Sequence, residues 1–113
     1  MQPQTKIYLL DENGQRFFGD GPCRLLLLVE KTRSLRAAAS EMGMAYTKAM
    51  KLIRQAEAAV GEPLTTRVAG GKDGGGSVLT ERGKELTQQY EAYRQRCIQA
   101  ADKLYQEIFG ADK

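Results

Sequence analysis

The sequence predicts a mainly helical domain with a small amount of β structure, and three observations support this. Residues 34–61 contain two helical stretches joined by a glycine, residues 64–80 contain a glycine-rich hairpin pattern, and residues 81–109 contain no proline. A chain of 113 residues is long enough for one domain with a modest core. We therefore expect residues 1–113 to form a single winged helix-turn-helix domain.

The central segment has the pattern of two helices joined by a tight turn. Ser34 is a favourable N-cap for a short alanine-rich helix, and Gly43 provides a left-handed residue that turns the chain. A second helix is expected from Ala45 to Val60, ending before Gly61. Helix pairs of this kind direct the second helix into the major groove of DNA.

The segment before this pair is expected to form a hairpin and then a helix. Asn13-Gly14 is a strong hairpin signal between two apolar stretches, so residues 6–18 are expected to pair as strands. An isolated hairpin is marginally stable, and this one must pack on the helical body or on a second subunit. The first helix is expected over residues 22–33, with Pro22 in its first position.

The candidate DNA-binding surface is the polar face of the second helix together with the wing, residues 64–80. Lysine and arginine bind phosphates or guanine, threonine can bond either base edges or phosphates, and methionine can contact a thymine methyl. A polar helix face can also be merely solvated; here Lys48, Lys51 and Arg54 are the strongest candidates for DNA contact. The full expected set is Ser34, Tyr46, Thr47, Lys48, Met50, Lys51, Arg54, Arg67, Gly71 and Lys72.

The distribution of charge supports this assignment more than its total does. The formal net charge is only +3, which is too small to imply a nucleic-acid partner. Residues 31–80, however, carry eight basic and four acidic side chains, a local charge of +4. The positive charge therefore lies on the segment with the helix-turn-helix pattern.

The long final helix, residues 81–109, carries an apolar stripe with heptad spacing. Such a stripe can pack on its own domain, but a helix of this length extends beyond a small body, which favours pairing with a second copy. Dimers also suit DNA recognition, because a two-fold protein matches a palindromic site. The expected dimer residues are Leu86, Tyr90, Tyr93, Cys97, Ala100 and Leu104.

Several functional classes lack support in the sequence. There is no histidine, nucleophile elbow or carboxylate cluster for enzyme chemistry, and Lys72 is followed by Asp73, which excludes a P-loop. Cys23 and Cys97 are expected to be plain thiols, so no metal site and no cofactor are predicted. The longest apolar run, Leu25–Val29, is too short for a membrane span, and without a signal-peptide stretch the expected location is cytoplasmic.

Three stretches carry a resemblance to a known family. They are Ser34-Leu-Arg-Ala-Ala-Ala, Gly43-Met-Ala-Tyr-Thr-Lys-Ala-Met-Lys-Leu-Ile and Gly70-Gly-Lys-Asp-Gly-Gly-Gly-Ser-Val-Leu-Thr-Glu-Arg-Gly. Over roughly residues 5–105 the chain resembles the N-terminal DNA-binding domain of the molybdate-responsive ModE regulators, which are similar to the LysR-type winged helix. The resemblance implies a dimeric transcription regulator with the helix from Ala45 in the major groove.

One part of that family is not expected here. Its members carry a second region of paired β-barrels that binds molybdate, and a chain ending at Lys113 has no room for it. Neither molybdate sensing nor the operator of the family is therefore carried over. The predicted function is sequence-specific binding of double-stranded DNA by a homodimer, away from membranes. The alternative is a protein-interaction winged helix or an accessory subunit without its own operator.

Overall fold

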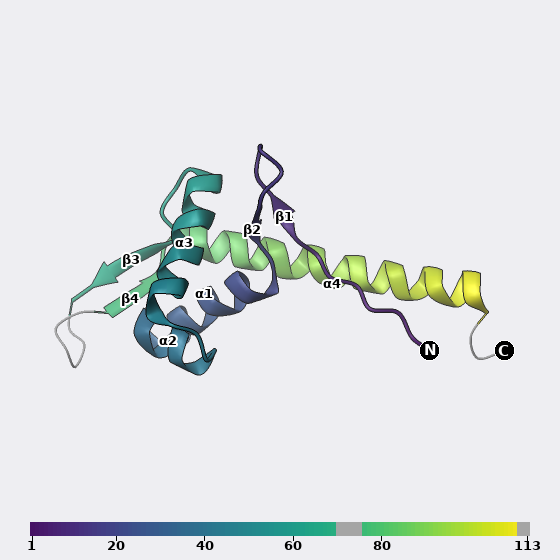
Figure 1. Cartoon of the computed structure of the whole chain (residues 1–113), viewed down its shortest axis with the longest axis horizontal. Helices are drawn as coiled ribbons and strands as arrows, with labels where there is room; N and C mark the ends of the chain where they lie inside the picture. The colour runs from purple at the N-terminus through teal and green to yellow at the C-terminus, as the bar shows by residue number, and fades with distance from the viewer. Residues whose placement is uncertain (70–75, 111–113) are drawn as a thin grey trace.

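The computed structural model describes residues 1–69 and 76–110 and has the predicted class, mainly helical with two small antiparallel sheets (Figure 1). The described elements, in chain order, are β1 (Leu9–Leu10), β2 (Arg16–Phe18), α1 (Asp20–Thr32), α2 (Leu35–Glu41), α3 (Tyr46–Val60), β3 (Thr65–Val68), β4 (Gly76–Leu79) and α4 (Glu81–Phe109).

Helix α1 begins two residues before the predicted start, which corrects the position of Pro22. Gly19 is the N-cap, and its carbonyl oxygen accepts a hydrogen bond from the Cys23 N–H at 3.0 Å. Pro22 therefore lies in the third position of the helix rather than the first. Proline is tolerated there because amides of the first turn have no partner within the helix.

The helix-turn-helix is formed by α2 and α3, as expected. The Ser34 hydroxyl oxygen caps α2 by accepting a hydrogen bond from the Ala37 N–H at 3.0 Å. Gly43, in the turn, has a φ of +67°, a conformation that glycine adopts without steric cost. Ala38 and Ala39 of α2 and Ala49 of α3 are buried. Their small side chains allow the backbones of the two helices to approach closely.

The N-terminal hairpin is short and packs on the helical body of its own chain. Strands β1 and β2 pair with a register shift between Leu9 and Leu10. Phe18, which is 1% exposed, meets the ring of Tyr90 edge-on at a centroid distance of 5.3 Å. The Tyr90 hydroxyl also donates a hydrogen bond to the carbonyl oxygen of Ile7 at 2.8 Å. The hairpin is thereby held against α4.

The wing pairs β3 with β4 in regular register, from Thr65 opposite Leu79 to Val68 opposite Gly76. Its base is joined to α4, since the Thr80 N–H donates to the Leu64 carbonyl oxygen at 3.0 Å. The Thr80 hydroxyl oxygen caps α4 by accepting from the Gly83 N–H at 3.0 Å. The wing therefore has a fixed position relative to the start of α4.

Helix α4 gives the molecule its elongated shape, 59 × 30 × 24 Å (Figure 1). Its first half packs on the body and its second half extends away from it, as the length predicted. None of the described helices is both long and apolar enough to cross a membrane.

Candidate DNA-binding surface

Helix α3 turns one face to the core and the other to solvent. Ala49, Ile53 and Ala56 are buried at helical spacing, which fixes the rotation of the helix about its axis. The remaining surface of α3 carries exposed polar side chains, which include four of the predicted DNA contacts: Thr47, Lys48, Lys51 and Arg54.

The cations of α3 are not neutralised by neighbouring carboxylates among the described residues. Every ion pair within the described part of the chain involves Arg82, Lys84 or Arg94, all of which lie on α4. Glu57, near the end of α3, accepts a hydrogen bond from the Leu64 N–H at 2.9 Å, which engages it at the entrance to the wing. The acidic side chains therefore leave the exposed cations of α3 available for a ligand.

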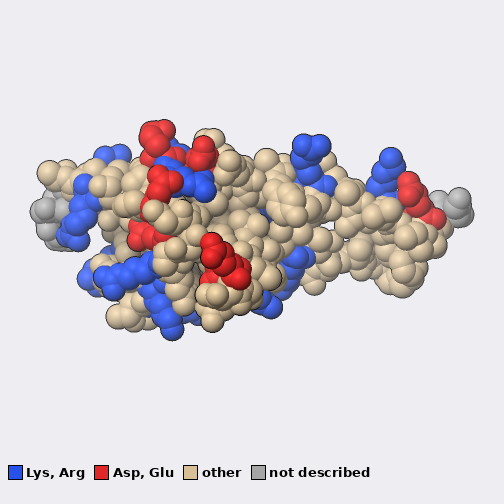
Figure 2. Space-filling model, turned by 90° about the horizontal axis from the view of Figure 1, so that it is seen from above, with Lys and Arg blue, Asp and Glu red and all other residues tan. Residues whose placement is uncertain are grey.

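The space-filling view shows where the charges gather. Lysine and arginine side chains cluster at the end of the molecule that carries α2, α3 and the wing (Figure 2). Acidic side chains lie among them, but the protruding part of α4 shows only scattered charges of both signs. A phosphate backbone would be attracted to the first end rather than to the second.

Two predicted DNA contacts, Tyr46 and Ser34, have a structural role as well. Tyr46 and Met50 are half-buried, and the Arg36 guanidinium lies 4.3 Å from the centre of the Tyr46 ring. This contact ties α2 to the first turn of α3. The Ser34 hydroxyl is occupied as acceptor in the N-cap of α2, which leaves its proton free to donate.

The wing contributes one described cation to this surface. Arg67 is exposed on β3, opposite Ser77 of β4. The two other wing residues of the prediction, Gly71 and Lys72, lie outside the described residues.

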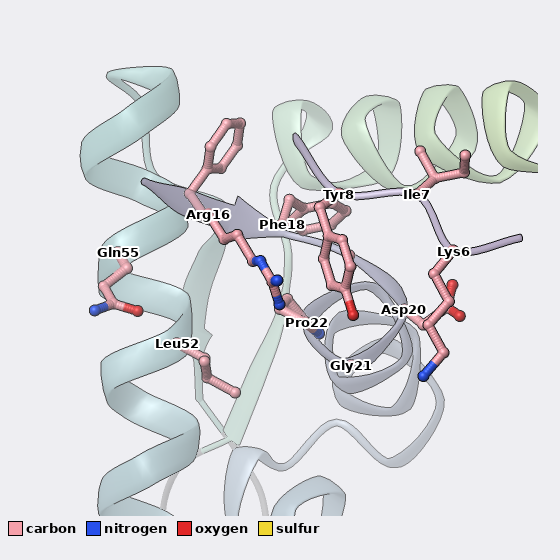
Figure 3. A pocket seen from close by; sticks show the side chains of 12 residues that line it. Lys6, Ile7, Tyr8, Arg16, Phe18, Asp20, Gly21, Pro22, Leu52 and Gln55 are labelled. Carbon is pink, nitrogen blue, oxygen red and sulfur yellow. The ribbon is translucent and has the colours of Figure 1, made fainter. Parts of the chain in front are cut away.

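A pocket of about 250 Å³ lies where the N-terminal hairpin approaches α3, and the sequence pattern did not indicate it. Its wall includes Tyr8, Arg16 and Phe17, with Leu52 and Gln55 contributed by α3 (Figure 3). The Arg16 guanidinium lies 4.0 Å from the centre of the Tyr8 ring. Because the hairpin and α3 both line this pocket, the hairpin lies directly beside α3.

The predicted dimer stripe is divided by the structure. Leu86 and Tyr90 are 5% and 2% exposed, so they belong to the core of their own protomer and not to a dimer surface. Farther along α4, Ala100 is exposed and Cys97 half-buried, while Tyr93 and Leu104 are 54% and 53% exposed. The first half of α4 packs on the body of its own chain, and this body covers the apolar stripe over that half.

The stripe also continues beyond the predicted residues. Ile108 and Phe109 are 73% and 59% exposed at the end of α4. Ile108 follows Leu104 by four residues, a helical spacing that could have identified it from the sequence. We define the distal stripe as Tyr93, Cys97, Ala100, Leu104 and Ile108.

Comparison with known proteins identifies the family of the central region. Residues 23–84 match the bacterial regulatory helix-turn-helix proteins of the LysR family. This match covers α2 and α3, both strands of the wing and most of α1.

Curated relatives extend the similarity over most of the chain. The chain is 33% identical over 106 residues to the molybdenum transport protein ModE of Azotobacter vinelandii, covering 91% of this chain and 39% of that protein. It is 34% identical over 103 residues to the DNA-binding transcriptional dual regulator ModE of Escherichia coli, covering 89% and 39%. With the molybdenum-pterin-binding protein MopB of Rhodobacter capsulatus it shares 36% identity over 84 residues, covering 74% and 31%. These similarities confirm the resemblance to ModE regulators, although the chain spans less than two fifths of each of these relatives.

Proposed function

The chain belongs to the bacterial regulatory helix-turn-helix proteins of the LysR family, which are regulators and not enzymes, and from this premise we propose that it binds double-stranded DNA sequence-specifically to regulate transcription. In this proposal α3 enters the major groove and the wing lies along the adjacent backbone. Lys51 and Arg54 reach base edges or phosphates, Thr47 and Lys48 assist them at the start of the helix, and Met50 offers a methyl contact.

The observation that carries the proposal is the exposed polar face of α3. Lys48, Lys51 and Arg54 are all exposed and form no ion pair with a described residue, whereas the cations Arg82, Lys84 and Arg94 of α4 are paired. Leaving cations unpaired on one face gains nothing for folding, but it favours binding to a polyanion. The Arg67 side chain on β3 extends this cationic surface to the wing.

We further propose that the protein acts as a homodimer through the distal stripe of α4. Tyr93, Leu104 and Ile108 are more than half exposed on a helix that extends beyond the body. An apolar stripe of this kind is unfavourable in water, and helical spacing suits it to pack against a second copy of itself. A two-fold dimer would present two copies of α3 to a palindromic site.

The test uses duplex fragments that the protein selects from a random-sequence library. Lys51→Ala and Arg54→Ala should each weaken binding to the selected site, by about 1–3 kcal/mol where the contact is a bidentate base contact. Arg24→Ala removes one exposed cation from α1 and serves as the matched control, with little expected effect.

Two results would contradict the proposal in different ways. Full affinity in both α3 variants would show that α3 does not read the DNA. Failure of the unmodified chain to select any duplex would favour the alternative of a protein-interaction winged helix.

A further inference from the structure

Arg33 adopts a backbone conformation that is unfavourable for it. Its φ and ψ are 60° and 30°, and among the described residues it alone has a positive φ without being glycine. It ends α1 in the same conformation in which Gly61 ends α3 and Gly110 ends α4. Glycine is the usual residue at such a position, because a Cβ atom meets the adjacent carbonyl oxygen there.

The contacts that impose this conformation use only the backbone of Arg33. Its N–H donates to the Val29 carbonyl oxygen at 2.7 Å, and its carbonyl oxygen accepts from the Ser77 N–H at 3.0 Å. Strand β4 passes so close that a Cβ atom built on Gly76 would lie 2.5 Å from the Arg33 oxygen. A glycine at position 33 could make the same backbone contacts without strain. The fold therefore explains the conformation of residue 33 but not its arginine side chain.

The position of Arg33 suggests what the side chain does. Ser77, whose N–H bonds to Arg33, is paired on its other side with Arg67 of β3. Arg33, Ser77 and Arg67 thus form one row across the wing, with Ser34 next to Arg33 at the start of α2. Both arginines are exposed, and neither forms an ion pair with a described residue. Backbone strain of this kind persists where a residue is functionally needed.

We infer that the Arg33 side chain binds a phosphate of the DNA backbone, extending the surface of α3 and the wing to the junction of α1 and α2. This inference rests on the proposed DNA-binding function. A guanidinium matches the geometry of a phosphate, and contacts to phosphate position the protein without reading sequence. Arg33 should therefore strengthen binding to all duplexes alike.

The test is Arg33→Gly, because strain and phosphate binding predict opposite effects. Removing the strain should raise the midpoint of thermal unfolding by about 4 °C at equal protein concentration. Losing the phosphate contact should weaken binding to selected and random duplexes by the same factor. It should also make the slope of log affinity against log salt shallower by about 0.9 per bound protomer. Between 50 and 200 mM salt, that is roughly a 3.5-fold smaller loss of affinity for each protomer.

Three further variants make the test specific. Arg33→Asn should bind DNA like Arg33→Gly, since asparagine also tolerates the left-handed conformation. Arg33→Lys should keep the salt slope, because it keeps the charge. Arg24→Ala should leave the slope unchanged, because Arg24 precedes Arg33 by a rise of about 13 Å along the axis of α1.

The inference is overturned if Arg33→Gly binds DNA with the parental affinity and slope. It is also overturned if Arg33→Gly lowers the unfolding midpoint, because the side chain would then be needed for folding. In both cases the variants Lys51→Ala and Arg54→Ala test the proposed DNA-binding function separately. If those two variants lose affinity for DNA, the proposed function stands although the inference about Arg33 fails. If they keep the parental affinity, the proposed function is rejected as well.

Discussion

The two halves of α4 have the same apolar spacing but different surroundings. In the first half, Leu86 and Tyr90 are buried against the body of their own chain. In the second half, Tyr93 and Leu104 are more than half exposed. Heptad spacing therefore identifies which face of a helix is apolar, but the length of the body decides how much of that face the protomer covers.

Replacing one tyrosine in each half of α4 by alanine should give the largest difference in the free energy of unfolding. Tyr90→Ala should lower the free energy of unfolding by about 3–5 kcal/mol, because it removes a buried ring that packs on Phe18. Tyr93→Ala, three residues farther along, should lower it by less than about 1 kcal/mol in dilute, monomeric protein. Denaturant titration measures both values. Equal losses would show that the division of α4 is wrong.

The two cysteines offer a second comparison, through pH. Cys23 packs under the first half of α4, where burial, reinforced by Glu91, raises the pKa of its thiol from 9.0 to about 12. The unfolded chain then loses this proton at lower pH than the folded chain does. The contribution of Cys23 to the free energy of unfolding should therefore be constant below pH 9 and fall as the pH rises from 9 towards 12, by on the order of 2 kcal/mol near pH 11.

The burial of Tyr90 raises the pKa of its hydroxyl and contributes to the same decline. Cys23→Ala should therefore reduce the alkaline loss of stability without abolishing it. Cys97→Ala, on the second half of α4, is the matched control and should reduce the loss by less than Cys23→Ala does, because Cys97 is only half-buried. Thermal unfolding at a series of pH values from 8 to 11 measures the effect. An equal reduction in the two variants would contradict the assignment to Cys23.

A charge on the distal stripe should separate the protomers. Leu104→Asp should raise the dimer dissociation constant at least tenfold, about 1.4 kcal/mol, because association would bury the carboxylate. Gln95→Asp adds the same charge to an exposed position elsewhere on α4 and should leave the dimer intact. Sedimentation equilibrium measures both constants. A monomeric parental protein would reject the dimer altogether.

The smallest expected effect concerns the N-terminal segment held by the first half of α4. Tyr90→Phe keeps the ring but removes the hydroxyl that donates to Ile7 and lies 3.0 Å from Asp20. The free energy of unfolding should fall by about 1 kcal/mol. Hydrogen exchange should become faster in residues 1–10 but not in α3. Unchanged exchange at the N-terminus would show that this hydrogen bond does not hold the segment.

Local signals predicted the helix-turn-helix well. The N-cap at Ser34, the left-handed Gly43 and the exposed face with Lys51 and Arg54 all follow from residues close together in sequence. The small and apolar residues of α3 recur at helical spacing and identify its buried face. The exposed face of α3 could therefore be inferred from the sequence alone.

Features that depend on distant residues were not predictable in this way. Tyr90 is a core residue because it contacts Ile7, Phe18 and Asp20. These three residues lie 70 or more positions earlier in the chain. The strain at Arg33 arises because Ser77 and Gly76 of the wing meet its carbonyl group. Spacing along the chain carries no signal for either contact.

The dependence of DNA affinity on salt tests most directly whether α3 and the wing form the DNA-binding surface. If Lys48, Lys51, Arg54 and Arg67 all neutralise phosphates, and Arg33 does so as inferred above, the slope of log affinity against log salt should be about −4.5 for one protomer and about twice that for a dimer. A slope near zero for the unmodified chain on duplex DNA would contradict that surface.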